Sequence, residues 1–176
     1  AIHFKPDGTK FFVVGTAGDD TIYEYSLTTP WSLGDGGVGT DEALDFVQSS
    51  SLKFKGGTDE GNMLGMHIDP DGTKLFTVGN SKDTVYEYSL LSPWSLGDGE
   101  VGTDEALDFV QSSSLRFEGA TDEATPFSID FKSDGTKMFM IGNVLNGVYE
   151  YSLSTPWNID SGSSASPGSM TFVQAS

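Results

Sequence analysis

The stretch "DGTKFFVVGTAGDDTIYEYSLTTPW", from Asp7 to Trp31, occurs three times in this chain with few changes. The second copy, "DGTKLFTVGNSKDTVYEYSLLSPW", runs from Asp71 to Trp94, and the third, "DGTKMFMIGNVLNGVYEYSLSTPW", from Asp134 to Trp157. The motif "YEYSL" begins at positions 23, 86 and 149, a step of 63 residues each time. A fixed period of this size indicates a repeat architecture in which each unit is one supersecondary element.

Each repeat has a β pattern along its whole length. In the first copy, "AIHF" alternates in polarity, "PDGT" has a turn composition, and "KFFVVG" is a short apolar run rich in β-formers. The segments "TIYEYSL" and "ALDFVQSS" supply a third and a fourth strand. No amphipathic window of helical length survives the Gly, Pro and Ser punctuation. The sequence therefore predicts four antiparallel strands per repeat. A cross-strand ion pair is expected between the lysine of the second strand and the glutamate of the third, at Lys10, Lys74 and Lys137 with Glu24, Glu87 and Glu150.

Strands that are apolar on both faces are typical of a propeller blade, whose sheet packs between neighbouring blades. We therefore predict an all-β fold, a β-propeller built from three four-stranded blades of about 63 residues. The expected blade repeats are residues 1–63, 64–126 and a shortened 127–176, which together form one propeller or half-propeller domain.

The inner hairpin also resembles a known family. "FKPDGTKFFVV" and "IDPDGTKLFTV" are similar to the Pro-Asp-Gly-Thr-Lys hairpin of YVTN-type and related β-propeller repeats of bacterial and phage proteins. The resemblance implies the propeller fold. It leaves the function open, because lactonases, surface proteins and proteins of no known activity share this hairpin.

Composition limits the partners. Nine Lys and Arg against 26 Asp and Glu give a formal net charge of −17, which argues against nucleic acid and anionic membranes. The absence of cysteine excludes disulfides, thiolate zinc sites and cysteine nucleophiles, and no apolar run is long enough to span a bilayer. The opening "AIHFKPDG" has neither an initiator Met nor a signal pattern, so we expect a processed product or a segment of a longer chain.

The repeated Pro-Trp step admits two interpretations. Trp31, Trp94 and Trp157 could be exposed platforms on which sugar rings stack. Alternatively, each could plug the outer end of its blade after proline turns the chain. We favour packing, because large aromatic side chains are usually buried, and keep glycan binding as the functional alternative.

Two acidic groupings are candidate metal sites. A loop of the second repeat carries five carboxylates: Asp98, Glu100, Asp104, Glu105 and Asp108. Such loops suit Ca²⁺, although this spacing matches no standard calcium loop and a solvated acidic face explains it better. His3, His67 and Asp130 occupy the same position in the first strand of each repeat. Converging on a propeller axis, they could resemble a facial metal triad, but polar residues facing a wet channel are the preferred interpretation.

Near-identity of the first two repeats favours a non-enzymatic module. A propeller enzyme builds its site from loops that differ between blades, whereas identical loops suit a scaffold or a multivalent surface for protein or glycan ligands. We therefore predict no enzymatic activity, no cofactor apart from a possible Ca²⁺, and a location outside the cell, on its surface or in a virion. The alternative function is a fragment of a propeller hydrolase or lactonase.

Three blades are too few to close a ring, because propellers need four to eight. Without closure, both end blades would expose an apolar face. We therefore predict either a longer parent chain or a head-to-tail dimer that closes six blades through a two-fold axis. In the dimer, the first repeat of one chain is expected to pack against the third repeat of the other. This contact would bury Phe4, Val13 and Tyr23 near Phe131, Met140 and Tyr151.

Overall fold

The computed structural model describes residues 1–15, 21–34, 44–51, 62–81, 84–97, 107–114, 125–143, 146–160, 162–163 and 166–176. All regular elements in these ranges are β-strands, so the predicted all-β class is confirmed. Within the same ranges, no helix is long and apolar enough to cross a membrane.

The strands form three four-stranded antiparallel sheets, one per repeat. Blade 1 contains β1 (Ile2–Phe4), β2 (Lys10–Val14), β3 (Thr21–Leu27) and β4 (Leu44–Ser51). Blade 2 contains β5 (Met63–Ile68), β6 (Lys74–Gly79), β7 (Thr84–Leu90) and β8 (Leu107–Ser114). Blade 3 contains β9 (Pro126–Phe131), β10 (Lys137–Gly142), β11 (Val148–Leu153) and β14 (Met170–Ala175). A small hairpin, β12 (Gly162–Ser163) with β13 (Ser166–Pro167), precedes β14.

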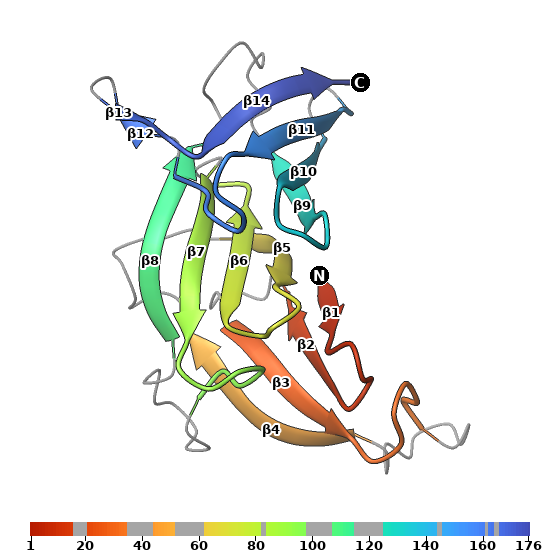
Figure 1. The fold of residues 1–176 in the computed structure, drawn as a ribbon. Coiled ribbons are helices and arrows are strands. Elements are labelled where there is room, and N and C mark those ends of the chain that lie inside the picture. The colour runs from red at the N-terminus through yellow and green to blue at the C-terminus, as the bar shows by residue number, and fades with distance from the viewer. Residues whose placement is uncertain are drawn as a thin grey trace.

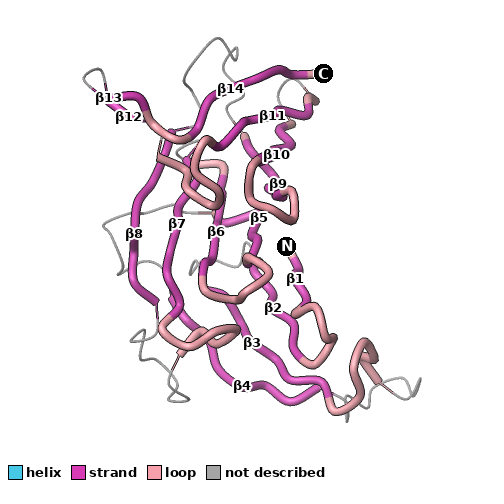
Figure 2. Tube along the Cα trace, viewed as in Figure 1, coloured by secondary structure: helices cyan, strands magenta, loops and turns pink. Residues whose placement is uncertain are grey.

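The three blades stand along an open arc with their first strands together on the inside (Figure 1). In blades 1 and 2 the strand order within the sheet follows the chain, and in blade 3 the outermost strand is β14. The tube in Figure 2 shows β4, β8 and β14 on the outside of the arc. The arc places blade 1 and blade 3 at opposite ends of the chain's sheet array.

A tight turn joins the first two strands of every blade. The glycine of each "DGT" motif has a φ of 70° to 72°, a left-handed conformation that glycine adopts without steric cost: Gly8, Gly72 and Gly135. In blade 1, the Asp7 carboxylate accepts hydrogen bonds from the backbone N–H (2.9 Å) and hydroxyl (2.6 Å) of Thr9. Asp134 accepts the same pair from Thr136 in blade 3. These contacts confirm the predicted Asp-Gly turn.

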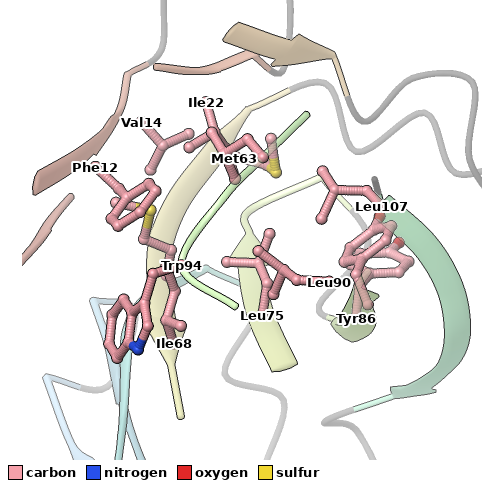
Figure 3. Close-up of a cluster of buried hydrophobic side chains, with 13 residues drawn as sticks. Phe12, Val14, Ile22, Met63, Ile68, Leu75, Tyr86, Leu90, Trp94 and Leu107 are labelled. Atoms are coloured by element: carbon pink, nitrogen blue, oxygen red, sulfur yellow. The ribbon is translucent and has the colours of Figure 1, made fainter. Parts of the chain in front are cut away.

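The core lies between the blades. At the first junction, blade 1 contributes three buried side chains, Phe12, Val14 and Ile22, and blade 2 contributes most of the rest of the cluster. Figure 3 shows these three gathered against side chains of blade 2 that include Met63 and Ile68. The second junction repeats the arrangement. Here blade 2 contributes the three equivalent side chains, and Phe76, Val78 and Val85 pack against the facing side of blade 3. A blade therefore presents a small apolar face to the next blade along the chain, which we call its forward face. It presents a larger one, its backward face, to the preceding blade.

This polarity corrects one predicted contact. Phe131, Met140 and Tyr151 belong to the second junction, where they are buried against blade 2. They are therefore not available to face another chain. Three residues of blade 3 are equivalent by register to Phe12, Val14 and Ile22 of blade 1. They form its forward face instead: Phe139, Ile141 and Val148.

Candidate functional site

A row of polar side chains crosses the inner strands of all three blades. His3, His67 and Asp130 lie at equivalent register positions, each paired with the phenylalanine of the next strand. The His67 Nδ1 lies 2.9 Å from Asp130 Oδ1, a hydrogen bond between blades 2 and 3. The His3 and His67 ring centroids are 5.0 Å apart in an edge-to-face arrangement. The fold thus brings together three residues that are more than 60 positions apart in sequence.

Tryptophans from the following blade cover both histidines. The Trp94 ring stacks on His3 with centroids 6.0 Å apart and planes at 12°, and Trp157 stacks on His67 at 5.7 Å and 21°. Burial lowers the pKa of His3 to about 4, and nearby His67 adds to the shift, against weaker opposition from Asp130 and a backbone hydrogen bond. Burial also lowers the pKa of His67, although Asp130 opposes the shift. Both imidazoles are therefore neutral at pH 7.

Exposure separates the two members of the hydrogen-bonded pair. The His67 side chain is 12% exposed, whereas that of Asp130 is 76% exposed. A neutral His67 donates its Nδ1–H to the carboxylate, so its tautomer is fixed and one carboxylate oxygen is held in place. The second oxygen of Asp130 is free to meet a molecule that enters from the inner side of the arc. Chemically, the pair is an oriented carboxylate base.

The structure describes one candidate metal site in full and the other only in part. Among the described residues, no group of three or more His, Asp or Glu side chains is placed to hold a metal ion. The histidine rings contact each other and tryptophan rather than converging with Asp130 on one point. Of the acidic loop, Asp108 is an exposed residue of β8. The other four carboxylates lie outside the described residues: Asp98, Glu100, Asp104 and Glu105.

The three tryptophans share an unusual backbone conformation. Their φ values are positive, between 58° and 64°, and each backbone N–H donates to the carbonyl of the turn glycine at 2.9 to 3.0 Å: Trp31 to Gly8, Trp94 to Gly72 and Trp157 to Gly135. Each indole lies against its glycine so closely that a Cβ there would come within 2.1 to 2.3 Å of the ring. The rings therefore cover the inner hairpin turn, and the predicted position at the outer end of the blade is wrong.

Burial of the tryptophans depends on the preceding blade. Trp94 is only 7% exposed, because blade 1 covers it, and Trp31 is 60% exposed. A sugar could not stack on Trp94 without opening the first junction. Trp31 is an exposed platform in the single chain, and Phe4 supports its other side at a centroid distance of 5.3 Å.

A polar trio that the sequence analysis did not find joins neighbouring blades. We call it the clasp, formed by a lysine, a glutamate and a glutamine of one blade: Lys10, Glu24 and Gln48; Lys74, Glu87 and Gln111; Lys137, Glu150 and Gln174. The pattern of lysine and glutamate predicts a cross-strand pair within a blade, and that pair is confirmed. The signal for the wider role is a glutamine at a fixed step of 63 residues.

In the first junction, the clasp of blade 1 holds the Pro-Trp-Ser-Leu loop of blade 2. The Lys10 ammonium binds Glu24 at 2.6 Å and donates to the Trp94 carbonyl at 3.0 Å. Glu24 also accepts a hydrogen bond from the Leu96 N–H at 2.9 Å. Gln48 Nε2 donates to Glu24 at 2.6 Å and to the hydroxyl of the loop serine at 3.0 Å. A fully buried carboxylate is thereby paired and hydrogen-bonded.

The second junction repeats the clasp. Lys74 binds Glu87 at 2.7 Å and donates to the Trp157 carbonyl at 2.6 Å. Gln111 donates to Glu87 at 2.6 Å and to Asn158 Oδ1 at 3.1 Å, so asparagine here replaces serine as the acceptor. Two junctions built in the same way show that the clasp is the standard connection between blades in this chain.

Comparison with known proteins shows similarity in fold to solved structures, one of which is a β-propeller domain. No family model matches the chain, and no curated protein matches it. A solved structure from Lactobacillus plantarum is similar over 99% of this chain and 40% of its own, with a TM-score of 0.57 and 13% identity. The β-propeller domain of Cps50 (Swd1) from Myceliophteria thermophila matches 87% of this chain and 37% of its own, with a TM-score of 0.51 and 9% identity. The likeness supports a propeller-type blade fold.

Another similar structure, from Bacteroides uniformis, is described as a "putative 6-phosphogluconolactonase". It matches 99% of this chain and 39% of its own, with a TM-score of 0.56 and 15% identity. A second structure so described, from Bacteroides fragilis, matches at a TM-score of 0.55 and 13% identity. The chain therefore spans about 40% of the length of the structures that it matches.

These two structures correct the prediction of a non-enzymatic module. Similarity between the repeats does not distinguish a scaffold from an enzyme, because one fold can carry either function. A similar fold occurs in two structures that are each described as a "putative 6-phosphogluconolactonase". The prediction that the chain is not an enzyme is therefore wrong on this comparison, and the hydrolase alternative is the better supported one.

Proposed function

We propose that the chain supplies three blades of a propeller hydrolase that opens a lactone ring. The observation that carries the proposal is the contact between His67 and Asp130 on the inner strands, 2.9 Å between Nδ1 and Oδ1. This contact orients an exposed carboxylate on the inner side of the arc (Figure 1), which would face the central channel if the blades belong to a closed propeller. The similarity in fold to structures described as lactonases supports the reaction class.

Lactone hydrolysis requires a base that activates water. In the proposed reaction, the Asp130 carboxylate accepts a proton from water while the water oxygen attacks the lactone carbonyl carbon. The tetrahedral intermediate then collapses with cleavage of the ring C–O bond, and the departing ring oxygen takes the proton back from Asp130. His67 is a positioning residue, because its Nδ1–H holds the carboxylate while its own ring is largely covered.

Charge favours an uncharged substrate. With a formal net charge of −17, the protein repels anions at long range. A phosphorylated lactone would need a cationic subsite, and the described lysines of the clasps are already paired with glutamates. We therefore propose an unphosphorylated sugar lactone as the substrate class.

A pH-stat assay tests the proposal by comparing ring opening of an aldonolactone and its 6-phosphate with the spontaneous rates. We expect the protein to accelerate opening of the uncharged lactone, and Asp130→Asn to lower the catalysed rate about 100-fold, as loss of a general base does. Asp45→Asn, which alters an exposed carboxylate on β4, is the matched control and should retain full activity. A wild-type rate equal to the spontaneous one, or an unchanged rate in Asp130→Asn, would contradict the proposal.

A further inference from the structure

No loop among the described residues occupies the clasp of blade 3. Lys137 contacts Glu150, and Gln174 Nε2 donates to the same carboxylate at 2.8 Å, as in the other blades. The side chains are more open to solvent, however. The Glu150 side chain is 14% exposed, whereas that of Glu24 is fully buried beneath the loop of blade 2. The acceptor for a Trp-Ser-Leu loop is thus already assembled before any loop binds.

The apolar face beside this clasp is also uncovered. Ile141 and Val148 are 50% and 43% exposed, although their equivalents in blade 1, Val14 and Ile22, are almost completely buried. Both blades present the same kind of side chain at these positions. The difference arises because blade 2 covers these positions of blade 1, whereas no described part of the chain packs on the equivalent face of blade 3.

Blade 1 presents the complementary half at the other end of the arc. Its backward face exposes several large apolar side chains whose equivalents in blade 2 are buried: Ile2, Tyr23, Trp31 and Leu33. The loop that carries Trp31 already has the bound conformation, because its φ of 64° and its hydrogen bond to Gly8 match those of Trp94. Ser32 likewise bonds to the carbonyl of Gly34 at 3.0 Å, as Ser95 does to its own loop at 2.8 Å.

We infer that the Trp31-Ser32-Leu33 loop of a second copy of this chain docks on the clasp of blade 3. By analogy with the first junction, Lys137 would donate to the Trp31 carbonyl, Glu150 would accept from the Leu33 N–H, and Gln174 would donate to Ser32. A second copy is the fitting occupant, because "PWSLGDG" of blade 1 is identical to the loop of blade 2 that the first clasp already holds.

The two halves do not meet within one chain, because blade 1 and blade 3 lie at opposite ends of the arc with blade 2 between them (Figure 1). Two reciprocal contacts between two copies, related by a two-fold axis, would join six blades, a number within the range of known propellers. Because each copy carries a net charge of −17, their long-range repulsion is expected to weaken dimerisation at low salt. The inference does not rest on the proposed lactonase activity.

Cross-linking tests the contact directly, because the chain has no cysteine of its own. A Ser32→Cys, Gln174→Cys double variant, treated with a short bis-maleimide, should give a covalent dimer on a denaturing gel. Each single variant should remain monomeric under the same treatment. The double variant Gln48→Cys, Ser95→Cys is the internal standard. These two side chains are in contact within one chain, so their cross-linked product should still run as a monomer on the denaturing gel. A double variant that stays monomeric while the internal standard reacts would overturn the inference.

Light scattering on unlabelled protein provides the second measurement. We expect a concentration-dependent dimer that strengthens with salt, and Trp31→Ala should raise its dissociation constant at least about 30-fold, as removal of an interface aromatic does. Val110→Ala, at an exposed apolar residue of β8 away from both halves, should leave the dissociation constant unchanged. A monomer up to about 100 micromolar, or a dimer unaffected by Trp31→Ala, would overturn the inference.

Discussion

Trp94 and Trp31 have the same local structure and opposite surroundings. Both follow a proline, have a positive φ and donate a backbone hydrogen bond to the glycine of the inner turn. Trp94 is 7% exposed under the clasp of blade 1, whereas Trp31 is 60% exposed because no other blade in the structure covers it. The repeat therefore builds the loop by itself, and burial of the ring is added by the neighbouring blade.

The comparison shows that each blade carries two different half-interfaces. The clasp and three apolar side chains face the next blade along the chain, and the tryptophan loop faces the preceding blade. Blade 2 has both halves filled, and the end blades have one half filled each. Matched substitutions at filled and unfilled positions consequently measure what a neighbouring blade contributes to stability.

The largest difference is expected at the clasp glutamates. Glu24→Ala leaves the Lys10 ammonium and the Leu96 N–H without their shared buried partner, so we expect a loss of about 4 kcal/mol in the free energy of unfolding. Glu150→Ala removes the same side chain where no described loop is bound, so a much smaller loss is expected in dilute solution. Urea denaturation measures both values. Equal losses would show that the clasp acts within a blade and not between blades.

A smaller difference is expected for the tryptophans. Trp94→Ala removes a buried ring that stacks on His3 and fills the first junction, and should cost about 3 kcal/mol. Trp31→Ala loses mainly the contact with Phe4, so about 1 kcal/mol is expected for the monomer. Thermal unfolding in dilute solution compares the two variants. If the Trp31 variant were as unstable as the Trp94 variant, the tryptophan would stabilise the fold through contacts within its own blade and not through packing between blades.

The smallest effect concerns pH. The pKa of His3 is about 4 in the folded chain against 6.5 as its ordinary value, so the unfolded chain binds more protons between these limits. Stability therefore falls as the pH drops from about 6.5 to about 4, and His67 acts in the same direction because its pKa is also lowered. We expect His3 to account for roughly 1–2 kcal/mol of this loss, given its partial exposure.

Urea denaturation of wild type and His3→Gln at pH 7 and pH 4.5 isolates this contribution. Glutamine does not titrate, so the variant should lose less stability than wild type between the two pH values. The subtraction removes the effect of the carboxylates, which both proteins share. An identical loss in both proteins would mean that Trp94 does not shield His3 as the stacked rings indicate.

Much of the fold could be predicted from the repeat alone. Apolar runs, the Asp-Gly turn and the spacing of Lys10 and Glu24 are local signals, and the structure confirms the strands, the turn and the ion pair. The shared position of His3, His67 and Asp130 could be found because equal positions in a repeat become neighbours when the repeats stack. The resemblance to YVTN-type repeats, the calcium loop and the extracellular or virion location stay predictions.

The contacts between blades could not be predicted, because no local period says which face of a sheet points forward. Phe131 and Phe139 are both apolar residues of inner strands, yet the first is buried against blade 2 and the second belongs to the forward face. The position of the tryptophans was missed for a related reason. A positive φ at Trp94 is unfavourable for its own residue type and accompanies the hydrogen bond to the glycine carbonyl, a contact between two turns of one blade that no local pattern reveals.

The division of each blade into a forward and a backward half has a consequence for how such a gene can change. A duplication or deletion of 63 codons adds or removes one clasp together with one loop, so every remaining junction still joins a matched pair. No compensating substitution is needed at the seam. Recombination between the nearly identical first and second repeats can therefore alter the number of blades in a single event, and the chain length can evolve in whole-blade steps.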